Sequence, residues 1–337
     1  MLGNKSKILV ANNYLNNFGG SETFTYTLIE ELLKRGFEVE YFTFEKGLFS
    51  DKIEKDLAVS FMSQKKYDLI LANHNTCVKF LFDKGFVIQT CHGIYPPLEQ
   101  PSIYADAYVS ISQEVQTHLA NRGFSSRIIY NGINAERFYP KKDINKNLKT
   151  VLSLCHSEEA NNMVEKACNQ IGVSFKQRNK YDGAIWDIQN EINEADLVVG
   201  LGRSAYEAMS CGRPTVIFDK RKYMESFSDG YVTHILGLSL QNNCSGRYSK
   251  LMLTEIDLAK EFLKYNAEDG KTLREFILKE LDIKKAVDQY FDYFTKINQI
   301  KTQRISYNNI KNITTKNFSI RLLEIKQYID KIRYRKR

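Results

Sequence analysis

The stretch "VGLGRSAYEAMSCGRPTVIFD", residues 199–219, decides the fold. An apolar run ends at Val199, Gly200 and Gly202 follow it, and a short helical pattern leads to a second apolar run at 215–218. A strand that passes through glycines into a helix exposes backbone N–H groups at the helix N-terminus, where phosphate binds readily. This pattern predicts an α/β domain with an anion site at the carboxyl end of a strand.

Three side chains in this stretch suit a nucleotide-diphosphate ligand. Ser204 is predicted to cap the helix, and Arg203 adds a planar positive group that pairs well with phosphate. Glu207 lies one turn into the helix, where a carboxylate can accept hydrogen bonds from sugar hydroxyls. The alternative is a tight strand-to-helix turn with a solvated Glu207, and the glycines alone do not separate the two interpretations.

Strand and helix patterns alternate on both sides of this stretch. Near the N-terminus, "KILVANN" predicts a strand, Ser21 is expected to cap the helix that follows, and Gly36 to end it. Alternating strands and helices indicate parallel sheets that are covered on both faces and bind ligands at the carboxyl ends of their strands. A lysine-rich stretch at 139–149 predicts a domain boundary, so we expect two doubly wound α/β domains that face a cleft. The predicted divisions are 1–145, 146–285, a helix over 286–300 that crosses back to the first domain, and a basic helical tail over 301–337.

The composition indicates a globular protein of the cytoplasm. The chain has 337 residues, 43% of them apolar, and no apolar run approaches the roughly 20 residues that span a bilayer. The N-terminus carries no apolar segment of the kind found in secretory signals. The six cysteines form no Cys-x-x-Cys pair and no metal-like spacing with histidines, so we expect small buried residues in a reducing compartment.

The positive charge is concentrated in the C-terminal tail. The net charge is +8, but residues 301–337 hold eleven Lys and Arg against two acidic residues, so the rest of the chain is nearly neutral. The tail also places Phe318, Leu322 and Ile325 on one helical face. Contact with an anionic membrane surface is one interpretation, and a solvated or self-associating helix is another. Nucleic acid is not an expected partner, because the basic stretch contains no recognisable binding module.

Four segments carry motifs in a characteristic order. They are "NNFGGSETFTYTLIEELLKRGFEV" (16–39), "TCHGIYP" (90–96), "YNGINAERFYP" (130–140) and "GRSAYEAMSCGRPTVIF" (202–218). Together they resemble the GT-B glycosyltransferases, especially the large retaining family numbered 4. The resemblance implies an acceptor-side N-terminal domain and a C-terminal domain that binds a nucleotide sugar. It also implies a transferase of hexosyltransferase type, which moves a sugar with retention to a cell-envelope glycan or lipid-linked acceptor in polysaccharide biosynthesis.

The resemblance also implies roles for individual residues. Gly19 and Gly20 would bring backbone amides against the donor or the acceptor, and His92 would lie beside the transferred sugar at the reaction centre. Glu207 would bind the ribose hydroxyls and act with His92 as a catalytic residue. The predicted donor-binding residues are Gly19, Gly20, Gly202, Arg203, Ser204, Ala205 and Glu207, with Asn131 as a weaker candidate. No cofactor or metal is expected, because the chain has no Asp-x-Asp motif and no cluster with metal-ligand spacing.

Two departures from the family pattern weaken the expectation about the donor. Val199 occupies the position of the family's first glutamate, which usually holds hydroxyls of the donor sugar. The segment "CHSEEANN" (155–162) lacks the Arg and Lys that usually meet the diphosphate, a role that Arg203 or, more weakly, Arg178 and Lys180 would then take. A non-catalytic GT-B subunit and a different GT-B enzyme, such as an epimerase or glycerophosphotransferase, therefore remain alternatives.

Overall fold

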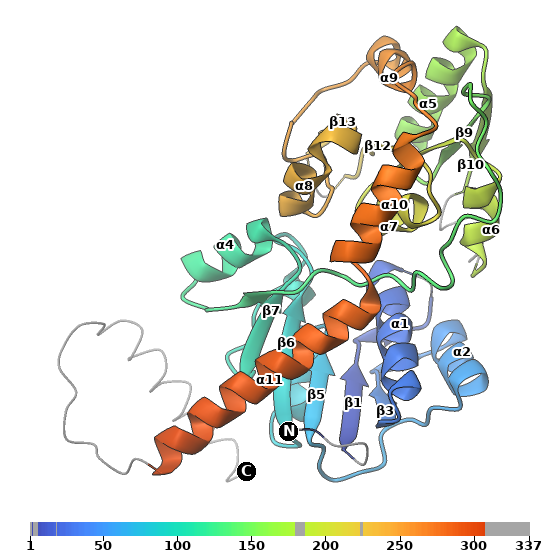
Figure 1. Ribbon diagram of the computed structural model, residues 1–337. Helices are drawn as coiled ribbons and strands as arrows, with labels where there is room; N and C mark the ends of the chain where they lie inside the picture. The colour runs from blue at the N-terminus through green and yellow to red at the C-terminus, as the bar shows by residue number, and fades with distance from the viewer. Residues whose placement is uncertain (1, 3–5, 18, 179–185, 223–224, 307–337) are drawn as a thin grey trace.

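The structure, a computed structural model, describes residues 2, 6–17, 19–178, 186–222 and 225–306, except for the side chains of 300–306. Figure 1 shows two α/β domains, one above the other, with the long helix α11 (Ile283–Ser306) lying across the lower, N-terminal one. The predicted α/β architecture is therefore confirmed. The exact domain boundaries stay predictions, and the part of the predicted tail over 307–337 lies outside the described residues.

A six-stranded parallel sheet forms the first domain. Its strand order is β3-β1-β5-β6-β7-β8. The order reverses between β1 and β5, so the loops that follow these strands diverge and open a crevice at their carboxyl ends. The elements are β1 (Lys7–Ala11), β2 (Tyr14–Leu15), α1 (Gly20–Lys34), β3 (Glu38–Phe42), β4 (Glu45–Lys46), α2 (Leu48–Leu57), β5 (Leu69–Ala72), α3 (Asn75–Leu81), β6 (Phe86–Cys91), β7 (Ala107–Ser110), α4 (Gln113–Asn121) and β8 (Arg127–Ile128).

The second domain is built on a five-stranded sheet of order β10-β9-β11-β12-β13, in which only the edge strand β13 is antiparallel. Its order reverses between β9 and β11, which gives this sheet a crevice as well. The elements are β9 (Thr150–Ser153), α5 (Glu158–Ile171), β10 (Ser174–Gln177), α6 (Ile188–Asn193), β11 (Leu197–Gly200), α7 (Arg203–Ser210), β12 (Thr215–Ile217), β13 (Gly230–Tyr231), α8 (Leu236–Ser239), α9 (Glu255–Phe262) and α10 (Asp269–Glu280).

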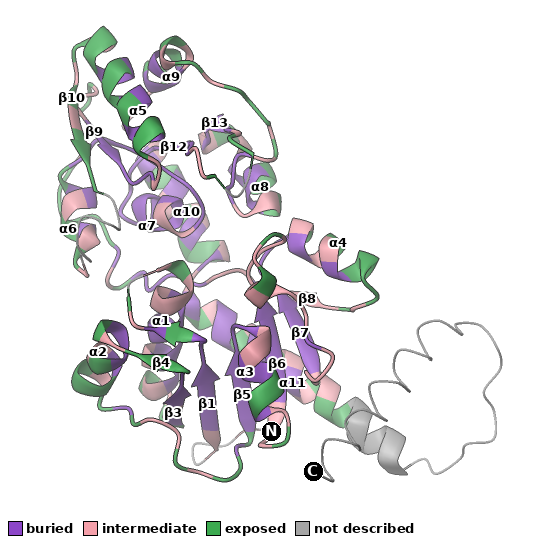
Figure 2. Ribbon diagram, turned by 180° about the vertical axis from the view of Figure 1, so that it is seen from behind, coloured by how far each residue is buried: buried purple, intermediate pink, exposed green. Residues whose placement is uncertain are grey.

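Helices cover both faces of each sheet. Figure 2 shows that the central strands are buried while the helices expose their outer faces. In the first domain, α1 and α11 cover one face of the sheet and α3 covers the other. In the second domain, α7 and α10 cover one face and α5 and α9 the other. All six cysteines are buried and unpaired, as the sequence predicts.

Helix α11 joins the second domain back to the first. It begins at Ile283, whose Cα lies only 2.6 Å from where a Cβ on Gly132 would stand, so glycine is required at this crossing. Its apolar side packs on the first domain, where the Tyr290 hydroxyl lies 2.7 Å from Thr90 Oγ1. Within the described residues, no helix combines the length and the apolarity needed to cross a membrane.

The helix starts differ from two of the sequence predictions. Helix α1 begins at Gly20 with Gly19 as its N-cap, so the predicted Ser21 cap is wrong; the Ser21 hydroxyl instead donates to Glu22 Oε2 at 3.0 Å. The predicted Ser204 cap is also wrong, because α7 begins at Arg203. Gly202 takes φ +54° there, and this left-handed turn brings the chain into the helix before Ser204 is reached.

Candidate active site

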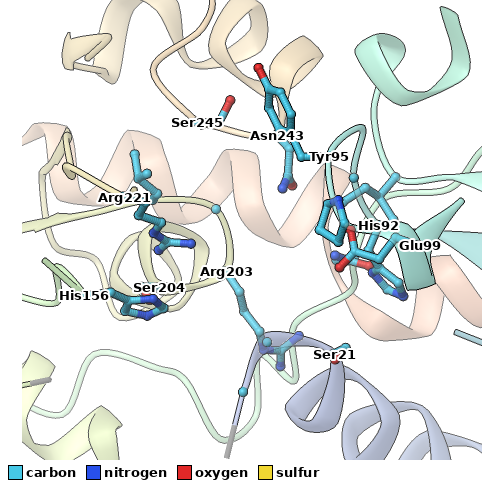
Figure 3. A pocket seen from close by; sticks show the side chains of 18 of the residues that line it. Ser21, His92, Tyr95, Glu99, His156, Arg203, Ser204, Arg221, Asn243 and Ser245 are labelled. Atoms are coloured by element: carbon cyan, nitrogen blue, oxygen red, sulfur yellow. The ribbon is translucent and has the colours of Figure 1, made fainter. Parts of the chain in front are cut away.

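A cavity of about 850 Å³ lies between the two domains. From the first domain it is lined by the loops after β1 and β6, and from the second by the loops after β9, β11 and β12. These loops leave the carboxyl ends of the strands, as expected for ligand sites in doubly wound sheets. Figure 3 shows side chains from both domains pointing into this space.

The cavity brings together most of the residues predicted from sequence. The predicted residues that line it are Gly19, Gly20, His92, Asn131, Gly202, Arg203 and Ser204. Ala205 and Glu207 are buried in α7 behind this surface and do not line it. Arg178 does not line the cavity; its Nη2 lies 3.0 Å from Glu191 Oε1 in an ion pair. Lys180 lies outside the described residues.

Arg203 turns inward rather than toward the open cavity. Its Nε donates to Glu207 Oε1 at 2.9 Å, Nη1 donates to the Gly132 carbonyl at 3.2 Å, and Nη2 donates to Thr27 Oγ1 at 3.1 Å. Burial raises the pKa of Glu207, and the positive charge of Arg203 opposes this rise. The pair therefore forms a hydrogen-bonded bridge from α7 to α1 and to the segment between the domains, at the border of the cavity.

A second arginine supplies positive charge to the cavity wall. Arg221 follows β12, lines the cavity, and donates from Nε to Asp219 Oδ2 at 2.7 Å. Asp219 also accepts from the backbone N–H groups of His156 and Ser157, at 3.1 and 3.2 Å. These contacts tie the loops after β9 and β12 together. Figure 3 shows Arg221 and His156 on the same side of the cavity, close to Ser204.

A chain of buried polar groups orients His92. Thr25 Oγ1 accepts from the side-chain amides of Asn12 at 3.0 Å and Asn73 at 2.8 Å. Asn73 Oδ1 therefore faces His92 Nε2, at 3.0 Å, so this nitrogen carries the proton and donates. Burial, together with His74 and Arg203, lowers the pKa of His92 to about 3, so the ring is neutral near pH 7.

Two carboxylates lie on the first-domain side of the cavity. Glu22 comes from the start of α1 and Glu99 from the turn after β6, and both line the cavity. Burial and the negative charge of Glu22 raise the pKa of Glu99 to about 7. The cavity thus has an acidic wall on the first domain and a basic wall on the second.

Polar contacts hold the two domains together around the cavity. Arg247 Nε and the Asn242 side-chain amide, both of the second domain, donate to Glu114 Oε1 of α4, at 2.6 and 3.1 Å. The Tyr95 hydroxyl donates to Glu225 Oε2 at 2.5 Å. With the Arg203 contact to α1, these bonds define a closed arrangement of the domains.

Several solved structures share this architecture. An α-glucosyltransferase solved with UDP and a 13-mer DNA that contains an HMU base is 13% identical, with 86% of this chain and 99% of that chain covered and a TM-score of 0.55. AviGT4, a glycosyltransferase involved in Avilamycin A biosynthesis, is 10% identical over 87% of this chain and 98% of its own, with a TM-score of 0.52. The chain has the GT-B fold. At these identities the likeness extends to the fold alone.

The GT-B fold is also found in enzymes that are not glycosyltransferases. A protein assigned as a UDP-N-acetylglucosamine 2-epimerase from Listeria monocytogenes is 13% identical, with 85% of this chain and 95% of that chain covered and a TM-score of 0.52. No protein-family model matches the chain, and no curated protein is significantly similar to it.

Sequence reasoning missed three charged residues of the GT-B cleft. Arg221 follows a strand end, which is a signal, but the same holds for many charged residues in a doubly wound fold. Glu99 and Arg247 lie in loops without periodicity or family pattern. Their proximity to the cavity depends on how the two domains are placed, which no local pattern encodes.

Proposed function

We propose that this protein is a retaining glycosyltransferase that moves a sugar from a nucleotide-diphosphate donor to a glycan or lipid-linked acceptor of the cell envelope. The observation that carries the proposal is the opposed charge of the two walls of the interdomain cavity. A cationic wall that includes a helix N-terminus suits the diphosphate of a donor. An uncharged or hydroxyl-rich acceptor suits the opposite, acidic wall.

The donor would bind at the start of α7. Ser204, in the first turn of α7, lines the cavity close to Arg221 and His156 (Figure 3), so a diphosphate bound there would receive both hydrogen bonds from the helix N-terminus and positive charge. Arg221 would thus take the role of the Arg and Lys that the segment 155–162 lacks. The Glu207 carboxylate already accepts a hydrogen bond from Arg203. To bind the ribose as well, it would have to accept hydrogen bonds from both Arg203 and the ribose hydroxyls.

The proposed reaction needs little covalent participation by the protein. A bond forms between the acceptor oxygen and the sugar C1, and the bond between C1 and the phosphate oxygen breaks. The proton of the acceptor hydroxyl passes to the departing diphosphate, whose charge the N–H groups of α7 and Arg221 would stabilise. Neutral His92 would position the sugar beside them through a hydrogen bond. No metal enters this scheme, and contact of 301–337 with an anionic membrane remains part of the proposal.

A thermal-shift screen against UDP, GDP, CDP, ADP and dTDP tests the donor site. We expect one diphosphate to raise the melting temperature by several degrees, with a smaller rise for its monophosphate, because a ligand stabilises the native state by binding it. The corresponding nucleotide sugars and an acceptor preparation then test transfer, and the anomeric configuration of the product tests retention. Absence of any shift would favour the non-catalytic subunit.

The likeness to an epimerase supports a second candidate. Two carboxylates near His92 could serve proton transfer at a sugar carbon instead of transfer of the sugar to an acceptor. Incubation of the nucleotide sugar in D₂O separates the two: incorporation of deuterium into the sugar without an acceptor would identify an epimerase.

A further inference from the structure

The acidic wall of the cavity has its own geometry. Glu99 ends a short 3-10 turn, Pro97–Glu99, and its carboxylate folds back over Gly93. A Cβ on Gly93 would lie 2.5 Å from Glu99 Oε2, and one on Gly19 would lie 2.3 Å from Glu22 Oε2. Each carboxylate therefore lies directly over a glycine, in space that a Cβ at that position would take from it.

Among the described residues, Glu99 has no partner for its charge. Within the part of the chain that the structure describes, no hydrogen-bond donor or cation contacts its carboxylate. The arginines that line the cavity, Arg203, Arg221 and Arg247, come from the second domain and are engaged with Glu207, Asp219 and Glu114. The raised pKa of Glu99 has the same origin, because burial beside Glu22 is not compensated by a positive group.

A partly buried carboxylate without donors is satisfied by a ligand that brings them. Hydroxyl and ammonium groups donate to carboxylates, whereas phosphate and carboxylate groups repel them. His92 lines the same wall, and Figure 3 shows it next to Glu99. Glu99 is therefore suitably placed to contact whatever sugar enters from the first-domain side.

We propose that Glu99, with Glu22 beside it, selects the acceptor. It accepts a hydrogen bond from a donor group of the acceptor sugar, a hydroxyl or an ammonium, and excludes acceptors that carry an anionic group at this position. This inference rests on the proposed function and makes it more specific: the acceptor is neutral or cationic where it meets the first domain.

Titrations of the full chain with three methyl glycosides test this assignment. The probes are methyl glucoside, methyl glucosaminide and methyl glucuronoside. Their binding is measured by ligand-observed NMR, with and without the nucleotide diphosphate that stabilises the protein most. At pH 8, where Glu99 with its pKa of about 7 is mostly ionised, we expect the wild type to bind the glucuronoside at least about tenfold more weakly than the glucoside, because like charges in contact are costly. Tighter binding of the glucosaminide than of the glucoside would indicate that the natural acceptor carries an ammonium group at this position. Equal binding of the glucosaminide and the glucoside would indicate a hydroxyl group.

Two variants and a control make the result specific to Glu99. In Glu99→Gln the tenfold discrimination should fall to near unity, while nucleotide binding stays unchanged. Gly93→Ala should reduce the discrimination as well, since its methyl group displaces the carboxylate without removing the charge. Glu38→Gln, an exposed carboxylate of the same domain, should behave as the wild type.

Three outcomes would overturn the inference: discrimination that persists in Glu99→Gln, equal binding of all three glycosides by the wild type, or no binding of any of them. Failure of the donor site is recognised separately, because it appears in the nucleotide arm alone. If the protein distinguishes the glycosides but binds no nucleotide, Glu99 still selects the carbohydrate, and the proposed transferase reaction is wrong.

Discussion

At the scale of single residues, the pair of Arg203 and Glu207 shows why sequence position alone does not define a role. Both side chains are nearly buried, at 9% and 10% exposed, and they neutralise each other 2.9 Å apart. A buried pair contributes little net stability compared with an apolar pair, but a single member left behind is an uncompensated buried charge. The pair is therefore structural even if it also contacts a ligand.

Glu207→Ala should destabilise the protein by roughly 3–5 kcal/mol, because Arg203 would remain buried without its partner. Glu207→Gln should cost less, since the amide oxygen still accepts from Arg203. Urea unfolding of both variants measures the difference. Equal stability of Glu207→Ala and wild type would contradict the structural role, and nucleotide binding should be compared only under conditions where both variants are folded.

Arg221→Ala should weaken binding of the nucleotide diphosphate by roughly 10- to 100-fold, the effect of losing a hydrogen bond to a charged group. Arg178→Ala is the matched control, because Arg178 pairs with Glu191 away from the cavity and should leave affinity unchanged. Isothermal titration calorimetry measures both. A loss of affinity in the control alone would place the diphosphate elsewhere.

Buried histidines should make the protein sensitive to mild acid. Burial lowers the pKa of His74 to about 4, and the Asn13 N–H donates to its Nδ1 at 3.1 Å, a bond that a protonated ring cannot accept. In the unfolded chain the ring takes up a proton near pH 6.5. The free energy of unfolding is therefore highest above pH 6.5 and decreases by roughly 3 kcal/mol as the pH falls toward 4. Urea unfolding at pH 7.5 and pH 5 checks this. His74→Gln should show a shallower loss, and an unchanged loss would mean that other groups are responsible.

At the scale of elements, the start of α7 depends on one glycine. Gly202 takes φ +54°, and its N–H donates to the Cys244 carbonyl at 2.9 Å, which ties the turn to the segment after α8. The first-turn N–H groups acquire their direction from this turn. Gly20, at the start of α1, has no such constraint: its φ is ordinary, and a Cβ there would meet no atom within 4 Å.

Gly202→Ala should therefore lower the stability by roughly 1–3 kcal/mol, because φ +54° with ψ −121° is a backbone conformation that side chains strain. Gly20→Ala should leave stability nearly unchanged and serves as the comparison. Thermal unfolding of both variants tests the difference. Loss of nucleotide binding in a stable Gly20→Ala would support the predicted ligand role of Gly20, whereas equal unfolding temperatures of the two variants would show that the Gly202 turn relaxes.

At the scale of the whole molecule, closure of the cavity depends on a few bonds between the domains. Glu114 of α4 accepts from both Arg247 and Asn242, and its side chain and that of Arg247 are only 16% and 12% exposed. This contact joins α4 of the first domain to the segment after α8 of the second, away in sequence from the chain connections at Gly132 and α11. Such contacts are expected to break when a two-domain enzyme opens.

Glu114→Ala should shift the protein toward an open state. We expect a larger radius of gyration by small-angle X-ray scattering and faster dissociation of the nucleotide diphosphate. Glu136→Ala provides a control, because Glu136 bridges Lys34 and Lys284 on the hinge side rather than across the cleft. If Glu114→Ala keeps the wild-type dimensions and dissociation rate, the remaining bonds suffice for closure.

The sequence was sufficient to predict the alternation of strands and helices, the doubly wound α/β architecture and several strand-end loops of the cavity, and the resemblance of four motifs added the GT-B fold. Such features follow from local patterns, because hydrophobic period, glycine turns and strand ends are encoded within a few residues. His92, Gly202 and Ser204 reach the cavity for this reason: each follows a strand directly or by a few residues, and the parallel sheet gathers strand ends at one edge.

Which charges face the cavity depends on the tertiary structure. Arg203 points inward because Glu207, Gly132 and Thr27 from three separate segments accept its hydrogen bonds. Arg221 and Glu99 reach opposite walls of one cavity only because the packing of the two domains brings loops from both sheets together. Electrostatic partners form between groups that are distant in the chain, and their choice depends on burial and distance, which exist only once the domains are packed.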